Sequence, residues 1–555
     1  MSLYYDASTL LSSSSTQGGS FKSRIYNSKS LKASPAQIYA LVTEASKWDI
    51  LLREVIENAG VLLLEPKLTP LLWLLLVHDH LLSKNGIAAP ASHPLRQAVE
   101  RHKARLKAEL TKSRVRRGCA SIQDLQAAVL SEKKALLGPE GITESMYPRW
   151  VRINNIKSTL KGQMEATFSD HCKVDDLSEL KSAKQIYVDH HIPDLVALAA
   201  GSVDFSSSKA YKDGEIILQD KASCFPAYLL LGDANGTWEG GDLVDGCAAP
   251  GNKTTHLASL LAARQNLLRS KKQHGRSKII SMDASAVRSK TLQKMVSVAG
   301  ADKLVNVLAG QDFLALDPED ERFEGVTGLL LDPSCSGSGI IGRDDVPKLV
   351  LPGQDKQPKS TNRGTKRKRP AENDAAKPSQ KQNEAQNKDS MDSERLLKLS
   401  NLQTHIVEHA LKFPAASKVT YSTCSIHMLE NECVVERVLA SEIARKRGWR
   451  IMRRHEQPEG LQKWRHRGIS VDPGSKSAGG ERKSGISVNL TDEQLDACLR
   501  CWPGDEECTG GFFVAGFVRD EALAEGPLDL EGKRALDHDK GRDNESESDW
   551  EGFSD

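Results

Sequence analysis

The chain has 555 residues, of which 39% are hydrophobic and 27% charged, with ten cysteines and a formal net charge of +2. This length allows about two to four domains with large buried cores. Scattered cysteines without a signal peptide do not indicate a disulfide framework, so we expect a reducing compartment. Prolines and charged residues interrupt the longest apolar stretch, 61–82, which makes it a poor membrane span and predicts a protein with no membrane partner.

Residues 1–135 are predicted to form a helical N-terminal domain, because they show helical periodicity and no strand alternation. The apolar run 70–77 is expected to be a buried helix. Basic residues cluster at 101–117, a pattern typical of nucleic-acid binding that also occurs, more often, on solvated helix faces.

A small mixed α/β segment is predicted over 148–218. It opens with alternating polar and apolar residues at 149–154, as in a half-buried strand. Arg149, Arg152 and Asn154 are candidates to contact RNA phosphate or sugar, and an ordinary exposed strand face is the alternative. We expect this segment to recognise RNA.

Strands alternate with helices over 219–525, which indicates an α/β domain with a mostly parallel sheet. Two insertions, 354–392 and 469–486, and an acidic tail, 533–555, are poor in apolar residues and are expected to be disordered. Deletion of the first insertion is expected to leave activity largely intact. Within it, the basic run 366–370 is similar to a nuclear import signal.

Three strand ends in this domain predict a nucleotide-like cofactor. The segment 242–255 reads as a strand, a turn containing Gly246 and Gly251, and a helix whose first amides favour an anion. Asp283 ends the next predicted strand, where an acid often binds ribose hydroxyls. Asp312 follows a third strand, near the expected place of an adenine, and each acid is equally well explained as a helix cap.

Two cysteines follow the next apolar runs, Cys335 in Asp332-Pro-Ser-Cys and Cys424 in Tyr421-Ser-Thr-Cys. The carboxyl ends of parallel strands gather at one edge of a sheet, so both thiols and the acids can face one crevice. A cofactor loop combined with two such thiols indicates covalent group transfer. Cys498, Cys501 and Cys508 lack a fourth ligand for zinc, and no metal is expected.

These motifs resemble the Nop/Sun family of RNA cytosine-5 methyltransferases over about 148–520. The resemblance rests on Ala249-Pro-Gly-Asn-Lys-Thr254, Asp332-Pro-Ser-Cys-Ser-Gly-Ser-Gly339, Tyr421-Ser-Thr-Cys-Ser425 and Glu430-Asn-Glu432. Most members have Ala-Pro-Cys where this chain has Pro-Ser-Cys. Together with the segment 219–226 and the helical N-terminal region, this departure is similar to the eukaryotic branch that methylates large-subunit ribosomal RNA.

The resemblance implies a Rossmann-like domain with a seven-stranded sheet and S-adenosylmethionine as cofactor. Its binding residues would be Cys247, Ala248, Ala249, Pro250, Gly251, Asn252, Lys253, Asp283, Arg288, Asp312 and Asp332. Cys424 would add to carbon 6 of the cytosine as the nucleophile. Asp332, protonated through burial, would contact ring nitrogen 3, with Lys253 near the base or the methionine carboxylate. Cys335 would help to resolve the adduct.

The implied product is 5-methylcytosine in ribosomal RNA, made during ribosome biogenesis by a monomeric enzyme of the nucleus and nucleolus, acting on rRNA or on a pre-ribosomal particle. Other readings are an RNA-binding assembly scaffold without required catalysis and methylation of another RNA such as tRNA. A DNA cytosine methyltransferase would use Cys335 as its nucleophile and leave Cys424 without a role. A dehydrogenase would share the glycine turn but would not explain the thiols.

Overall fold

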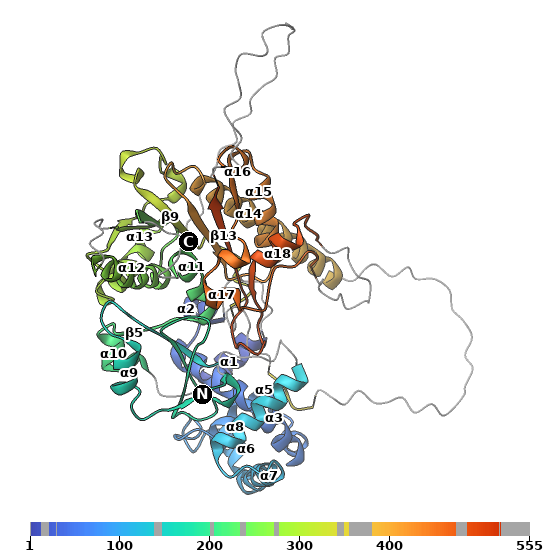
Figure 1. The fold of residues 1–555 in the computed structure, drawn as a ribbon. Coiled ribbons are helices and arrows are strands. Elements are labelled where there is room, and N and C mark those ends of the chain that lie inside the picture. Colours follow the sequence, from blue (N-terminus) through green and yellow to red (C-terminus); the bar gives the residue numbers. More distant parts are fainter. Residues whose placement is uncertain are drawn as a thin grey trace, which may run out of the picture.

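The structure is a computed structural model, shown in Figure 1. It describes residues 2–12, 21–28, 30–137, 147–199, 205–232, 240–270, 277–340, 349–353, 380–472, 486–520 and 522. Among these residues, no helix combines the length and apolar content that crossing a bilayer requires.

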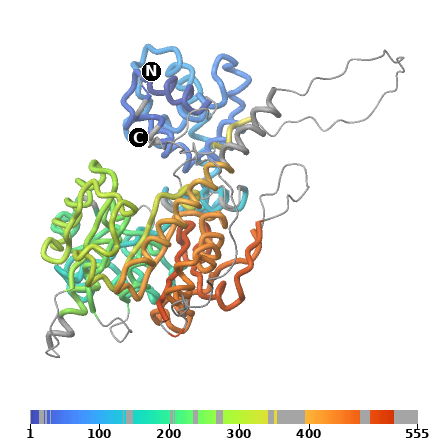
Figure 2. The backbone as a smooth tube through the Cα atoms, turned by 90° about the horizontal axis from the view of Figure 1, so that it is seen from above, coloured from blue at the N-terminus to red at the C-terminus, as the bar shows by residue number. Residues whose placement is uncertain are grey.

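The N-terminal part is helical and forms a lobe of its own, blue in Figure 2. Its core lies mainly between α3 (Pro35–Asn58) and α5 (Pro70–Leu81). Thr69 begins α5 by accepting a hydrogen bond from the Leu72 amide, and most of the helix is buried, which confirms the predicted buried helix. The remaining helices of this lobe are α1 (Ser2–Ser12), α2 (Phe21–Asn27), α4 (Val61–Leu64), α6 (Pro94–Arg101), α7 (Lys103–Arg116) and α8 (Ile122–Leu137).

A short strap, residues 349–353, ties this lobe to the rest of the chain. Leu349 and Leu351 pack against the N-terminal core. The Val350 amide donates to Asp49 at 2.9 Å, and Asp49 also pairs with buried Lys133 at 2.7 Å. In the sequence, the strap follows the Cys335 segment.

A five-stranded sheet follows, in the order β2-β3-β4-β1-β5. β1 lies between β4 and β5 and is antiparallel to both. Its strands are β1 (Arg149–Ile153), β2 (Cys172–Val174), β3 (Gln185–Val188), β4 (Leu195–Leu198) and β5 (Ile216–Leu218), and its helices are α9 (Leu160–Glu165), α10 (Lys209–Lys212), η3 (Leu177–Glu179) and η4 (Phe205–Ser207).

The second sheet has the order β11-β13-β10-β9-β6-β7-β8, with β12 paired to β13. The strands β8, β7, β6, β9 and β10 are parallel to their neighbours, and β13 is antiparallel to β10, β11 and β12. The central strands are apolar runs because helices cover both faces. The strands are β6 (Asp242–Asp245), β7 (Ile279–Asp283), β8 (Val305–Ala309), β9 (Val326–Leu331), β10 (Lys418–Thr423), β11 (Trp449–Ile451), β12 (Leu499–Cys501) and β13 (Phe512–Arg519).

The order of the strands creates a switch point between β6 and β9. The chain passes from β6 outward to β7 and β8, then returns to the other side of β6 with β9. Loops that leave β6 and β9 therefore diverge and open a crevice at the carboxyl ends of these strands. The Rossmann-like α/β architecture predicted from the sequence, with a helical lobe and a small mixed sheet before it, is confirmed. The sheet has eight strands among the described residues rather than the expected seven, because β12 pairs with β13 beside the main path.

The helices of this domain are α11 (Lys221–Leu231), α12 (Asn252–Ser270), α13 (Ala286–Val298), α14 (Gln380–Ala410), α15 (Glu432–Ala440), α16 (Glu442–Lys446), α17 (Glu459–Gln462) and α18 (Asp492–Ala497), with short turns η5 (Phe313–Ala315), η6 (Glu321–Phe323), η7 (Met428–Glu430) and η8 (Arg454–Glu456).

Residues 380–392, the last part of the first insertion that we expected to be disordered, belong to α14. Low apolar content suggests disorder here, but Gln, Lys, Glu and Ala also favour helices, and this propensity accounts for the difference. Residues 354–379, including the basic run 366–370, lie outside the described residues, as do 473–485 and the acidic tail. At the edges of the second insertion, Val471 and Ser487 form an isolated bridge.

Candidate active site

The loop between β6 and α12 is held against the end of β7. The Ala248 amide donates to the Met282 carbonyl at 2.9 Å, and the Ala249 amide donates to Asp283 at 3.3 Å. Arg288 donates to the Ala249 carbonyl at 2.6 Å and lies 3.5 Å from Asp283. The structure therefore brings together the predicted loop, the strand-end acid and the arginine.

Gly251 gives this loop its close approach to α13. Its φ is +115°, which side chains rarely adopt, and an added Cβ would lie 3.1 Å from atoms of Leu292 and Met295. Pro250 is exposed, and Cys247 and Asn252 are partly buried. Burial and neighbouring carboxylates hold the pKa of the Cys247 thiol above its ordinary range, so this cysteine stays protonated.

Asp312 lies beyond the end of β8, at the same edge of the sheet but two strands away from β6. Its exposed carboxylate accepts a hydrogen bond from the Leu314 amide at 3.1 Å and thereby caps η5. Contact with an adenine stays a prediction, because the geometry here is that of a cap.

Lys253, Asp332 and Ser422 meet at the switch point. Lys253 Nζ lies 2.7 Å from Asp332 Oδ2, and the Ser422 hydroxyl donates to Oδ1 at 2.8 Å. Burial alone would lower the pKa of Lys253, but the Asp332 carboxylate and, more weakly, Cys424 and Asp245 raise it overall. Asp332 thus accepts hydrogen bonds from an ammonium and from a hydroxyl group.

Cys335 and Cys424 form a thiol pair with their sulfurs 3.0 Å apart, although 89 positions separate them in the chain. The hydrogen bond to Cys424, followed by burial and the charges of Cys424 and Asp332, raises the pKa of Cys335 far above its ordinary range. Cys335 therefore keeps its proton, and a hydrogen bond joins the two sulfurs in which either thiol can be the donor. Cys424 also interacts electrostatically with Lys253 and contributes to the raised pKa of that lysine.

Sequence analysis missed several polar partners of this centre. Asp245, at the end of β6, accepts a hydrogen bond from Thr254 at 2.6 Å. Burial raises its pKa to about 7, helped by the Asp332 charge and opposed by Thr254. Ser422 was detectable, since it lies two residues before Cys424 and therefore on the same face of the strand.

The predicted RNA contacts at Arg152 and Asn154 are wrong, because both side chains are buried. β1 lies inside its sheet, and every residue from Trp150 to Ile153 is buried. Arg152 donates to Gln219 at 2.8 Å and to Thr255 at 3.0 Å, and Asn154 donates to backbone carbonyls. Burial lowers the pKa of Arg152 to about 10. Arg149 remains exposed.

The basic cluster 101–117 is partly neutralised. Arg101 pairs with Glu65 at 2.5 Å, and Arg117 contacts both Glu54 and Glu132. Exposed basic side chains remain along α7, among them Lys103 and Lys107. RNA binding by this helix stays a prediction.

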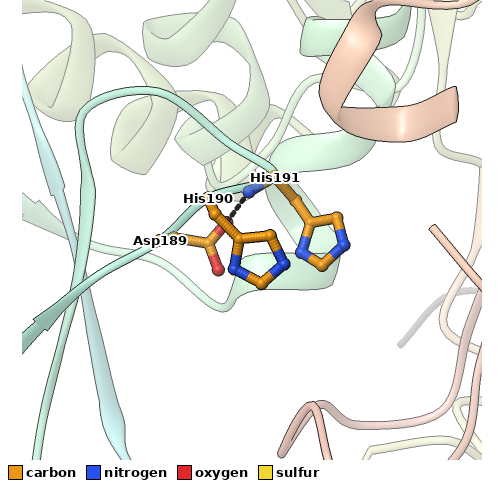
Figure 3. A group of neighbouring side chains, drawn as sticks. All are labelled: Asp189, His190 and His191. Atoms are coloured by element: carbon orange, nitrogen blue, oxygen red, sulfur yellow. Dashed lines mark hydrogen bonds between the residues drawn. The ribbon is translucent and has the colours of Figure 1, made fainter. Parts of the chain in front are cut away.

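One group of possible metal ligands occurs among the described residues, formed by Asp189, His190 and His191 (Figure 3). The Lys221 ammonium already occupies its cation-binding side, 2.5 Å from Asp189 Oδ2 and 3.0 Å from His191 Nδ1. Burial and the Lys221 charge lower the pKa of His191 to about 3, so its ring is neutral and accepts from Lys221. In this group the Lys221 ammonium therefore supplies the positive charge that a metal ion would otherwise bring.

Three family profiles match successive parts of the chain. Residues 36–126 match the N-terminal domain and 147–219 the ferredoxin-like domain of NOL1/NOP2/Sun domain family member 5, and 234–360 match the 16S rRNA methyltransferase RsmB/F profile. The chain is also 36% identical to the 25S rRNA (cytosine-C(5))-methyltransferase rcm1 of Schizosaccharomyces pombe, over 94% of this chain and 92% of the relative. The chain belongs to the NOL1/NOP2/Sun family.

Relatives from animals and plants share most of this length. The 28S rRNA (cytosine-C(5))-methyltransferase of Mus musculus is 32% identical over 94% of this chain and 92% of its own. The 25S rRNA (cytosine-C(5))-methyltransferase NSUN5 of Arabidopsis thaliana is 30% identical over 91% of this chain and 71% of its own. The similarity to these family members thus includes the helical lobe and the small sheet as well as the thiol-bearing domain.

Proposed function

We propose that this protein transfers a methyl group from S-adenosylmethionine to carbon 5 of a cytosine in large-subunit ribosomal RNA. The observation that carries the proposal is the thiol pair beside Lys253 and Asp332 at the switch point. The relatives named above, which share nearly the whole chain, are 25S or 28S rRNA cytosine-C(5)-methyltransferases.

The loop 247–253 suits the cofactor, which supplies the methyl group when bound. Gly251 lets the loop lie close against α13, and Asp283 and Arg288 stand together at the loop, where a ribose and a charged group would be received. Asp245 Oδ1 is a buried oxygen for which no hydrogen-bond partner occurs within the described chain. Such an orphaned acceptor fits a donor group on a bound molecule.

Cys424 attacks carbon 6 of the cytosine as a thiolate held by the Lys253 ammonium. The carbon–sulfur bond forms as electrons move through the ring toward nitrogen 3 and carbon 5. Protonation at nitrogen 3 neutralises the negative charge that develops on the ring. The Lys253–Asp332 pair contains one transferable proton, and passing it through Asp332 to the ring would give Asp332 the donor role expected from the sequence.

Cys335 acts after methyl transfer. The proton on carbon 5 must leave, and the electrons of that bond restore the double bond as the Cys424 sulfur departs. In the adduct Cys424 is a thioether and carries no charge, so its contributions to the high pKa of Cys335 disappear, while the effect of burial remains. Formation of the adduct therefore makes it easier for Cys335 to lose its proton to solvent, and the resulting thiolate can take the carbon-5 proton directly or through water.

The target cytosine must lie outside a helix stack to reach this crevice, which favours a single-stranded or extruded base. We place the protein in the nucleus and nucleolus as a monomer, acting on rRNA or a pre-ribosomal particle. A tRNA substrate, or a scaffold role in ribosome assembly, is the alternative; the complete set of reactive groups favours the enzyme.

The test is transfer of labelled methyl groups from S-adenosylmethionine to large-subunit rRNA lacking the modification, to pre-ribosomal particles and to tRNA, followed by nucleoside analysis. We expect 5-methylcytidine in rRNA or particles with wild type and none with Cys424→Ala. Label found only in tRNA would show that tRNA, and not rRNA, is the substrate. Binding to particles without label on any RNA would support the scaffold.

A further inference from the structure

The turn between β10 and α15 lies beneath both thiols. Glu430 ends η7, Asn431 follows it, and Glu432 begins α15, and all three side chains are fully buried. Buried polar side chains are costly unless they are hydrogen-bonded, so their partners indicate what they hold in place.

Glu430 holds the loop that carries Cys335. Its carboxylate accepts from the Ser336 amide at 2.8 Å, from the Ser336 hydroxyl at 2.5 Å and from Gln403 Nε2 at 3.0 Å. The same Gln403 amide donates to the Ser334 carbonyl at 3.0 Å. The residues on both sides of Cys335 are therefore fixed through Glu430.

Asn431 holds the loop that carries Cys424. The Thr423 hydroxyl donates to Asn431 Oδ1 at 2.6 Å, and Asn431 Nδ2 donates to the Ser425 carbonyl at 3.0 Å. The residues on both sides of Cys424 are thus fixed by the side chain next to Glu430.

The turn itself is held in place by Arg500 and Tyr421. Glu432 forms a buried two-fold ion pair with Arg500, at 2.5 and 2.6 Å, and Arg500 also donates to the Ile426 carbonyl. The Tyr421 hydroxyl donates to the Glu430 carbonyl at 2.5 Å. Two adjacent residues on one rigid turn consequently set the spacing of two sulfurs that come from distant parts of the chain.

We propose that Glu430 and Asn431 are positioning residues, one for each thiol, that separate the two halves of the reaction. The inference rests on the proposed function, in which Cys424 forms the adduct and Cys335 resolves it. Loss of the Asn431 contacts misplaces Cys424 and slows adduct formation. Loss of the Glu430 contacts misplaces Cys335, so the adduct forms and is released slowly.

The test compares covalent RNA–protein adduct on denaturing gels with methylated product, for wild type, Glu430→Gln and Asn431→Ala. We call the contacts of Glu430 the Glu430 arm and those of Asn431 the Asn431 arm. The milder variants Ser336→Ala and Thr423→Val each remove one hydroxyl, from the Glu430 arm and the Asn431 arm respectively, and are less disruptive to folding. Val438→Ala, a buried apolar truncation in α15 outside both arms, is the matched control for lost stability.

We expect the Glu430 arm to raise the ratio of adduct to product about tenfold, and the Asn431 arm to lower adduct and product together by about tenfold, as misplacement of reacting groups commonly does. Val438→Ala should leave the ratio unchanged. Equal ratios in both arms, in the milder variants as in the others, would overturn the inference. If a folded Cys335→Ala variant traps no adduct, the proposed function itself is wrong, and this outcome is distinct from a failure of the positioning roles alone.

Discussion

Lys221 and Lys253 make the same kind of contact in two regions of the molecule and differ in exposure. Each stands at the start of a helix, each pairs with a carboxylate, Asp189 at 2.5 Å and Asp332 at 2.7 Å, and each ammonium lies about 5 Å from an aromatic ring. The first pair is fully buried, whereas the side chains of the second are 13% and 28% exposed.

In the proposed mechanism, this difference in exposure distinguishes a structural ion pair from a reactive one. Lys221 is enclosed by Trp150 and Trp464 and shared with Glu507 and His191, so its charge is balanced internally. Lys253 and Asp332 face the crevice beside two thiols, where an incoming base can exchange partners with them. Exposure and neighbours, rather than residue type, decide what a lysine–carboxylate pair does.

Lys253→Met should have the largest effect on catalysis. It removes both the cation that stabilises the Cys424 thiolate and the transferable proton, and we expect transfer to fall by about 10²–10⁴-fold, the usual contribution of a positioned acid or base. The measurement is the single-turnover rate of methyl transfer, with thermal unfolding as a check on folding. A rate within a factor of about three of wild type would contradict the role given to Lys253.

Lys221→Met should instead affect stability. It leaves Asp189 and Glu507 without their buried cation, and removal of one partner from such a pair costs about 3–5 kcal/mol. Chemical denaturation should show this loss, while the rate per folded molecule stays near wild type. A folded, stable variant with a large catalytic defect would erase the distinction between the two lysines.

Asp245→Asn should change how stability depends on pH. The pKa of Asp245 is raised from 3.8 to about 7, so its contribution to stability is fully present below about pH 4 and is lost as the pH rises through about 7. The loss amounts to about 4 kcal/mol at most. The unfolding midpoint should therefore fall less between pH 5 and pH 8 in the variant than in wild type. Parallel pH profiles would mean that Asp245 does not titrate in this range.

Arg149→Ala should have the smallest effect. Its exposed side chain, on the strand that also carries buried Arg152, is available to RNA phosphate, and loss of one such contact lowers affinity by less than about tenfold. Binding measured at two salt concentrations should show a smaller salt dependence with no change in stability. Arg152→Ala is the contrast, because it should destabilise the fold and leave the salt dependence unchanged.

The sequence predicted the groups at the strand ends better than their surroundings. Cys335, Cys424 and Asp332 could be placed at one crevice because parallel strands end at one edge, whereas Lys253 was placed there through the family resemblance. The pairing of particular atoms could not be predicted, since the 3.0 Å contact between the sulfurs depends on buried partners such as Glu430.

Burial was the second weakness of the sequence reading. Alternation along 149–154 correctly indicated a strand, but alternation assumes one covered face, and β1 is covered on both. Arg152 and Asn154 therefore appeared exposed in the pattern although tertiary packing encloses them. At 380–392, low hydrophobicity predicted disorder, although these residues belong to α14.

The central claim is that Cys424 bonds to RNA and Cys335 releases it. The most direct measurement compares Cys335→Ala with the double variant Cys335→Ala, Cys424→Ala, each incubated with S-adenosylmethionine and unmodified large-subunit rRNA and analysed on a denaturing gel. We predict a nuclease-sensitive RNA–protein band with the single variant and none with the double variant. A band that persists without Cys424, or appears only when Cys335 is intact, would contradict the account.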